Sequence, residues 1–195
     1  MKVQDADVAQ YDLTSRLIHL GLAALGIAAI VSGQFADDYK SPVHGGFTVH
    51  SWIGLGMAAV IALRLVWGIV GPRDMRFHSW FPFTPAGMQR VGKDLLGLVR
   101  LRLPGAEKHV GLSALVQAIG LIVFTWTAVT GALLYVYLEP GYRATGGVRI
   151  IKELHEGAQA VLLGYLATHI GAVLLHALVG HPIWRRMLPW SAGKR

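Results

Sequence analysis

Three histidines stand in a nearly uncharged stretch, LHEGAQAVLLGYLATHIGAVLLH at residues 154–176, which is apolar enough to cross a membrane. An imidazole in hydrocarbon is costly unless it is hydrogen-bonded or bound to a metal. Fourteen residues separate His155 from His169, and in an α-helix they rise about 21 Å with an angular offset of about 40°. The two rings therefore point from one helix face at two depths, and each needs its own partner.

Two other apolar stretches each supply one partner. His50 lies near the outer end of the stretch 47–70, and His19 lies near the inner end of the stretch 17–33. We expect His50 to pair with His155, and His19 with His169. Facing imidazoles in a helical bundle are typical of bis-histidine haem iron, which needs no thiolate. The chain has no cysteine, and zinc would lack its usual four ligands, so the spacing predicts two haem b groups.

Each imidazole nitrogen that is not bound to iron needs an acceptor, for which we expect a backbone carbonyl. Glycines near His19 and His50 would let a porphyrin ring approach the backbone closely; they are Gly21, Gly26, Gly54 and Gly56. The alternative reason for these glycines is helix–helix packing, in which small residues are common in membranes.

Two arginines and a third histidine share these faces. Arg64 follows His50 by 14 residues and Arg16 precedes His19 by three, so either guanidinium is a candidate partner for a haem propionate. Snorkelling to the headgroups is the alternative for both. His176 lies about 10 Å beyond His169 along the helix, too near the surface for a second haem ligand. It is assigned to quinone binding or proton handling, or else to a structural role.

The elements that must position these residues are four apolar spans. The chain is 53% hydrophobic and 15% charged, with a mean hydropathy of +0.47, whereas soluble domains are about 25% charged. Runs of about 20 apolar residues cross a bilayer as helices. They are expected at about 14–33, 47–70, 110–138 and 153–180, with Asp12, Thr14 or Ser15 as the first N-cap. The prediction is an all-α membrane protein, a single domain over 1–195, built as a four-transmembrane-helix bundle with the haem b sites in its core.

The charges indicate an orientation. Four spans place both termini on one side of the membrane, together with the loop 71–109. The basic residues on that side are Lys2, Arg16, Arg73, Arg76, Arg90, Lys93, Arg100, Arg102, Lys108, Arg185, Arg186, Lys194 and Arg195. The opposite side has only Lys40, Arg143, Arg149 and Lys152. The positive-inside rule therefore predicts cytoplasmic termini, and no groove-reading or base-stacking element suggests nucleic acid as a partner. No cleavage site follows the first apolar run, so we expect no signal peptide.

The loop 71–109 is the least membrane-like region. Its segment AGMQRVGKDLLGLVRLRL, residues 86–103, is compatible with a basic amphipathic helix on the cytoplasmic leaflet. An ordinary loop anchored by aromatic residues is the alternative. The four histidines in loops or at span ends are expected not to be ligands; they are His44, His78, His109 and His181.

Three segments resemble the bacterial cytochrome b561 family, which includes the b-type cytochrome subunits of nickel–iron hydrogenases. YDLTSRLIHL (11–20) resembles the family's opening, and VHSWIGLGMAAVIALRLVWGIVGPRDMRFHSW (49–80) its second helix and exit. ELHEGAQAVLLGYLATHIGAVLLH (153–176) resembles its fourth helix, including the histidine spacing. The resemblance implies haem ligands at His19, His50, His155 and His169.

The expected function is electron transfer by a di-haem cytochrome b in the bacterial inner membrane. It would pass electrons between the quinone pool and a periplasmic redox partner, such as a c-type cytochrome or a dehydrogenase or hydrogenase, docked on the outer loops 34–46 and 139–152. An alternative is a self-contained enzyme of the same fold that oxidises superoxide and reduces ubiquinone. A third is a haem-free structural or transport protein. The outer side is about neutral, which weakens the attraction of a small anion.

Overall fold

A computed structural model describes residues 11–105 and 109–188, and every regular element in these residues is helical. Four helices are long and apolar enough to cross a membrane: α1 (Leu13–Gly33), α2 (Gly45–Val70), α5 (Leu112–Tyr137) and α6 (Gly146–Leu178). The chain is thus an all-helical membrane protein, as its sequence predicts. Four residues in the count of basic side chains lie outside the described ranges; they are Lys2, Lys108, Lys194 and Arg195.

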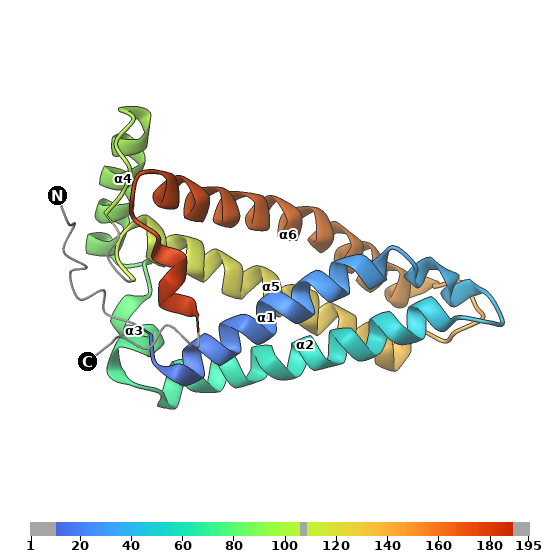
Figure 1. The fold of residues 1–195 in the computed structure, drawn as a ribbon. Coiled ribbons are helices and arrows are strands. Elements are labelled where there is room, and N and C mark those ends of the chain that lie inside the picture. The colour runs from blue at the N-terminus through green and yellow to red at the C-terminus, as the bar shows by residue number, and fades with distance from the viewer. Residues whose placement is uncertain (1–10, 106–108, 189–195) are drawn as a thin grey trace.

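The four long helices run roughly along one direction and form a bundle (Figure 1). α1 packs on α2, α2 on α5, and α5 on α6. By contrast, α6 makes at most marginal backbone contact with α1 and α2. α6 therefore meets α1 and α2 through side chains of the apolar core, such as Leu162, rather than through close backbone approach.

The start of α1 and the start of α6 have different causes. Asp12, one of the three expected N-caps, accepts hydrogen bonds from the Ser15 amide (3.0 Å) and hydroxyl (2.6 Å). α6 begins at Gly146 rather than near 153. Its first turns are polar but carry two ion pairs of i,i+4 spacing, Arg149–Glu153 and Lys152–Glu156, which stabilise a helix outside the apolar run.

The segment between α2 and α5 is a set of short helices. It contains η2 (Arg73–Met75), α3 (Phe77–Trp80) and α4 (Pro85–Val99). Thr84 caps α4 by accepting the Gly87 amide at 3.1 Å, and Pro85 occupies the first turn. The sequence left this segment open between a loop and an amphipathic helix, and the structure has a helix of 15 residues there. α4 lies crosswise to the long helices at one end of the bundle (Figure 1).

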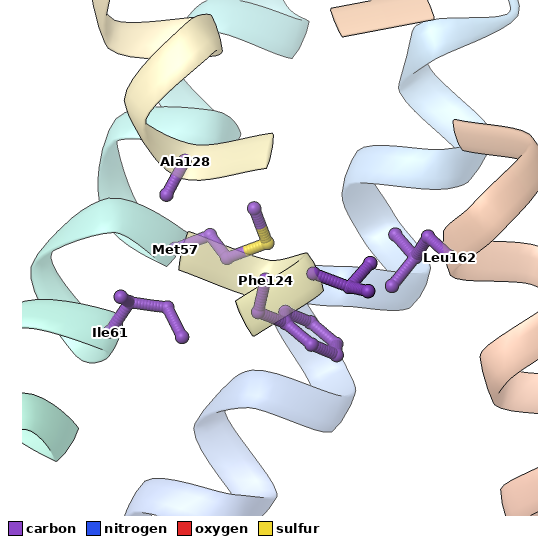
Figure 2. Packing of buried hydrophobic residues seen from close by; sticks show 6 residues of the cluster. Met57, Ile61, Phe124, Ala128 and Leu162 are labelled. Carbon is purple, nitrogen blue, oxygen red and sulfur yellow. The ribbon is translucent and has the colours of Figure 1, made fainter. Parts of the chain in front are cut away.

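The apolar core occupies the middle of the bundle. It comprises Met57, Ile61, Val123, Phe124, Ala128 and Leu162 (Figure 2). Leu162 stands midway along α6 between His155 and His169. The packed core thus separates the two histidine levels.

At the other end of the bundle, the loops form a packed cap. η1 (Ala36–Lys40) holds Tyr39, which is buried with Leu134 and Leu138. The Gly141 amide donates to the Tyr39 carbonyl at 2.7 Å, so the two loops are joined. Asp38 accepts the amides of Gly46 and Phe47 at 2.7 Å each, which fixes the start of α2.

Near α4, η3 (Ile183–Met187) folds back against α6 and α1. Arg16 Nη1 donates to the Leu188 carbonyl at 3.1 Å, which links the start of α1 to the end of the described chain.

Candidate functional site

The outer pair consists of His50 on α2 and His155 on α6. Their ring centroids are 6.1 Å apart, with an interplanar angle of 67°. A cavity beside the pair is lined by both rings and by Gly33, Gly54 and Gly131. The structure therefore brings together the two residues that the sequence paired at this level, although the backbones of their helices make at most marginal contact.

A hydroxyl lies behind each ring of the outer pair. Ser32 Oγ is 3.1 Å from His50 Nδ1, and Thr130 Oγ1 is 2.9 Å from His155 Nδ1. Both hydroxyls already donate to backbone carbonyls, Ser32 to Ala29 and Thr130 to Trp126. Each hydroxyl therefore accepts from the Nδ1–H of its histidine, which leaves Nε2 unprotonated and able to bind a metal. The sequence reasoning expected backbone carbonyls as acceptors, and it missed these two hydroxyls.

Two glycines missed by the sequence reasoning also border the outer pair. A Cβ on Gly131 would lie 3.0 Å from His155 Cε1, and one on Gly33 would lie 3.4 Å from His50 Cε1. Of the expected glycines, Gly54 lines the cavity. Gly21 and Gly26 instead face Val60 and Phe124, which is the packing role.

The inner pair consists of His19 on α1 and His169 on α6. Their ring centroids are 6.3 Å apart, with an interplanar angle of 51°. Tyr165, one turn before His169, stacks on the His169 ring at 5.7 Å and 14°. Stacking restricts the rotation of that ring, so Tyr165 is a positioning residue. The spacing of four residues between Tyr165 and His169, which places both on one helix face, could have indicated this contact from the sequence.

Arg64 lies over the aromatic side chains of α3. Its guanidinium is 5.4 Å from the Phe77 ring centroid and 5.7 Å from that of Trp80. Arg64 Nη1 is buried and has no hydrogen-bond partner among the described residues. A buried cationic donor without a partner is costly, so this group suits an anionic ligand. Arg16, the other expected propionate partner, bonds to the Leu188 carbonyl.

His176 is buried near the end of α6, and its Nδ1 also lacks a hydrogen-bond partner among the described residues. Its titratable neighbours are His181 and Arg186. The ring that faces His19 is that of His169, not that of His176. His176 therefore belongs to neither pair, and its buried Nδ1 is able to form a hydrogen bond with a ligand.

Among the remaining histidines, His109 has the most elaborate surroundings. It stacks on Trp80 at 5.6 Å and 25°, and its Nδ1 lies 2.7 Å from Gln117 Oε1. Tyr11 meets it edge-on at 5.2 Å, and burial raises the pKa of the Tyr11 hydroxyl. This cluster fastens the segment before α5 to α3. His44, at the N-cap of α2, contacts the Ser41 carbonyl.

The two histidine pairs can be compared with what a bare metal ion and a metal-containing macrocycle each require of a binding site. Within residues 11–105 and 109–188 there is no cluster of three or more histidine and acidic side chains, so a metal ion held by the protein alone would lack ligands. Two imidazoles that share one metal each place a nitrogen about 2 Å from it, which sets their ring centres about 6 Å apart. Both measured separations agree with this value. The cavity beside the outer pair suits a flat macrocycle that supplies the remaining ligands.

Comparisons with known proteins give one finding. A family model described as prokaryotic cytochrome b561 matches residues 10–190. No curated protein and no solved structure matches the chain.

Proposed function

Because this chain belongs to the prokaryotic cytochrome b561 family, and is thus a transmembrane electron-transfer cytochrome that binds haem b, we propose that it holds two haems. The outer haem would be held by His50 and His155, and the inner haem by His19 and His169. When bound, haem iron alternates between ferric and ferrous states and so carries one electron. Two such sites at two depths would connect the two faces of the inner membrane.

The observation that carries this proposal is the pairing of the imidazoles. Four histidines from three helices form two facing pairs, with centroid separations of 6.1 and 6.3 Å. Chance placement of polar rings in apolar helices would leave them scattered or facing lipid. At the outer level, Ser32 and Thr130 hold the rings with Nε2 free.

The basic residues at the inner level support a role toward propionates. The unpartnered Nη1 of Arg64 would gain a charge-assisted hydrogen bond from a carboxylate. Phe77 and Trp80 hold the guanidinium in place. Arg16 lies three residues before His19 on the same helix face and is the second partner in this proposal.

The quinone would bind on the inner side, near His176. Its buried Nδ1 is available to hydrogen-bond a quinone oxygen or to pass a proton. His181 and Arg186 contribute polar surroundings. His176 would thus handle the proton that accompanies each electron between quinone and the inner haem.

The periplasmic partner, such as a c-type cytochrome or a dehydrogenase or hydrogenase, would dock on the outer cap, residues 34–46 and 139–152, which include η1 and the first turns of α6. This surface exposes large apolar side chains, among them Phe35, Val43 and Tyr142. The joined loops give it a fixed shape. In this proposal both termini would lie in the cytoplasm, in agreement with the positive-inside rule.

A direct reaction with superoxide has less support. Its attraction would rest on four outer basic residues, and three of these are paired with acids: Lys40 with Asp37, Arg149 with Glu153, and Lys152 with Glu156. Pairing cancels much of the field that would concentrate a small anion. Rapid mixing of the purified protein with superoxide tests this alternative; a reaction near the diffusion limit would establish it.

The di-haem proposal is tested by the haem-to-protein ratio of purified protein. We expect two haems per chain, resolved as two components in an optical redox titration. His169→Ala should retain one haem, and His176→Ala should retain both but be reduced more slowly by quinol. His78→Ala, which changes an exposed histidine, is the matched control. A ratio of one in the unaltered protein, or loss of a haem only in His176→Ala, would contradict the assignment.

A further inference from the structure

α4 has the position of a helix that lies on a membrane surface. It runs crosswise to the four long helices at the end of the bundle where α5 begins (Figure 1). Asp94 on α4 accepts the amide of Leu112, the first residue of α5, at 2.7 Å. Because α5 is a membrane span, this contact sets α4 at the depth where the span begins.

The side chains of α4 divide into two faces. At 100° per residue, the apolar residues Met88, Val91, Leu95, Leu96, Leu98 and Val99 fall on one arc. Arg90, Lys93 and Arg100, which directly follows the helix, fall on the opposite arc, and all three are exposed. α4 therefore has the amphipathic pattern of interfacial helices.

The rest of the protein covers only one edge of the apolar face. Val91 is 2% exposed against the bundle, whereas Leu96 is 53% and Val99 is 82% exposed. The end of α4 that carries these two residues projects beyond α6 (Figure 1). The described part of the protein thus leaves most of the apolar face of α4 uncovered, so another molecule must cover it.

We infer that α4 is a binding surface for anionic phospholipids. Its apolar face lies among the acyl chains, while Arg90, Lys93 and Arg100 contact headgroup phosphates. Charge complementarity selects this occupant, since basic side chains flank an apolar face at the level of the headgroups. Asp94 is the one acidic residue of the helix, and it is already engaged by the start of α5. This surface is separate from both histidine pairs.

The test uses the haem-loaded full chain in vesicles of equal parts phosphatidylglycerol and phosphatidylcholine. The absence of native cysteine allows single labels at Val99→Cys, on the apolar arc, and at Ala86→Cys, on the polar arc, as the matched control. A nitroxide at residue 99 should collide more with oxygen than with a water-soluble nickel chelate, and one at residue 86 should do the reverse. A label at residue 99 that is open to the chelate, or shielded from both reagents, would overturn the inference, because water or another protein would then cover the face.

Lipid selectivity is measured with a fluorescent label at residue 99 and brominated acyl chains. Brominated phosphatidylglycerol should quench more than brominated phosphatidylcholine at equal mole fraction. Each of R90Q, K93Q and R100Q should lower the relative association constant about five-fold. In the protein with native basic residues, raising salt from about 0.1 M to about 1 M, which shortens the Debye length from about 10 to about 3 Å, should remove the preference. Equal quenching by the two lipids at low salt would overturn the selectivity.

Discussion

Ser32 and Thr130 decide which nitrogen of each outer imidazole is free. Both hydroxyls donate a hydrogen bond to a backbone carbonyl, so they act as hydrogen-bond acceptors toward Nδ1. A hydrogen bond at Nδ1 orients the ring and raises the basicity of Nε2, as carboxylate and carbonyl acceptors do behind other metal-binding histidines. In the proposed outer site, the strength of His50 and His155 as iron ligands would thus depend on two residues that contact the imidazoles but not the iron.

Thr130→Ala tests this dependence. Loss of the acceptor should lower haem affinity at the outer site by about 10- to 100-fold. It should also raise the midpoint potential of that haem, because a less basic ligand stabilises ferric iron less. Redox titration and haem retention on dilution measure the two effects. Thr168→Ala, which alters a threonine that bonds only within its own helix, should change neither; an equal effect of both variants would point to a general loss of stability.

Arg64 carries a separate prediction at the inner site. Arg64→Gln removes a buried positive charge, and positive charge favours the reduced haem. The inner midpoint potential should therefore fall, by about 60 mV if the equilibrium changes tenfold. Arg64→Lys, which keeps the charge, should shift it less. An unchanged midpoint potential in Arg64→Gln would show that the charge of Arg64 does not act on the inner haem.

At the level of elements, the outer cavity depends on close approaches between helices. α5 contributes Gly131 directly beside His155, where any side chain would press on the ring. α6 stays apart from α1 and α2 while packing on α5. Glycine on α5 and the sparse backbone contact of α6 with α1 and α2 together leave room beside the outer rings.

Gly131→Val should therefore empty the outer site. A Cβ at this position already lies 3.0 Å from His155 Cε1, and the branched side chain adds volume beside the ring. The expected result is one haem per chain, with the inner component retained in the redox titration. Gly157→Val on α6, where a Cβ meets nothing within 4 Å, should keep two haems. Retention of both haems in Gly131→Val would contradict this prediction, because the cavity would then accommodate the valine side chain together with the haem.

On the scale of the whole molecule, charge and apolar surface are distributed by membrane level. The α4 end of the bundle carries Arg73, Arg76, Arg90, Lys93, Arg100 and Arg102 among its described residues, and the opposite cap has three of its four basic side chains in ion pairs. From this distribution the positive-inside rule predicts that the basic end lies in the cytoplasm.

Reporter fusions test this orientation in cells. A fluorescent protein fused after residue 195 should fluoresce, and alkaline phosphatase at the same place should be inactive. Alkaline phosphatase inserted after Val43, in the outer cap, should be active. Val43 is 82% exposed, and the insertion leaves the Gly141–Tyr39 hydrogen bond between the loops in place. The reverse pattern of activities would place the termini in the periplasm.

The sequence by itself determined the spans and the histidine pairs. Apolar length defines a membrane helix because the bilayer has a fixed thickness, and a spacing of fourteen residues nearly closes whole helical turns. These are local regularities, so His19, His50, His155 and His169 could be paired before any coordinates were known. The same regularity separated His169 from His176.

The tertiary structure alone decided which residues surround those pairs. Ser32, Thr130 and Gly131 come from helix faces whose rotation is set by packing against neighbouring helices, and no spacing along one segment encodes that rotation. The sequence also left α4 open between helix and loop, since its basic and apolar residues suit either. Its contact with the start of α5 through Asp94, distant along the chain, fixes its place at the end of the bundle.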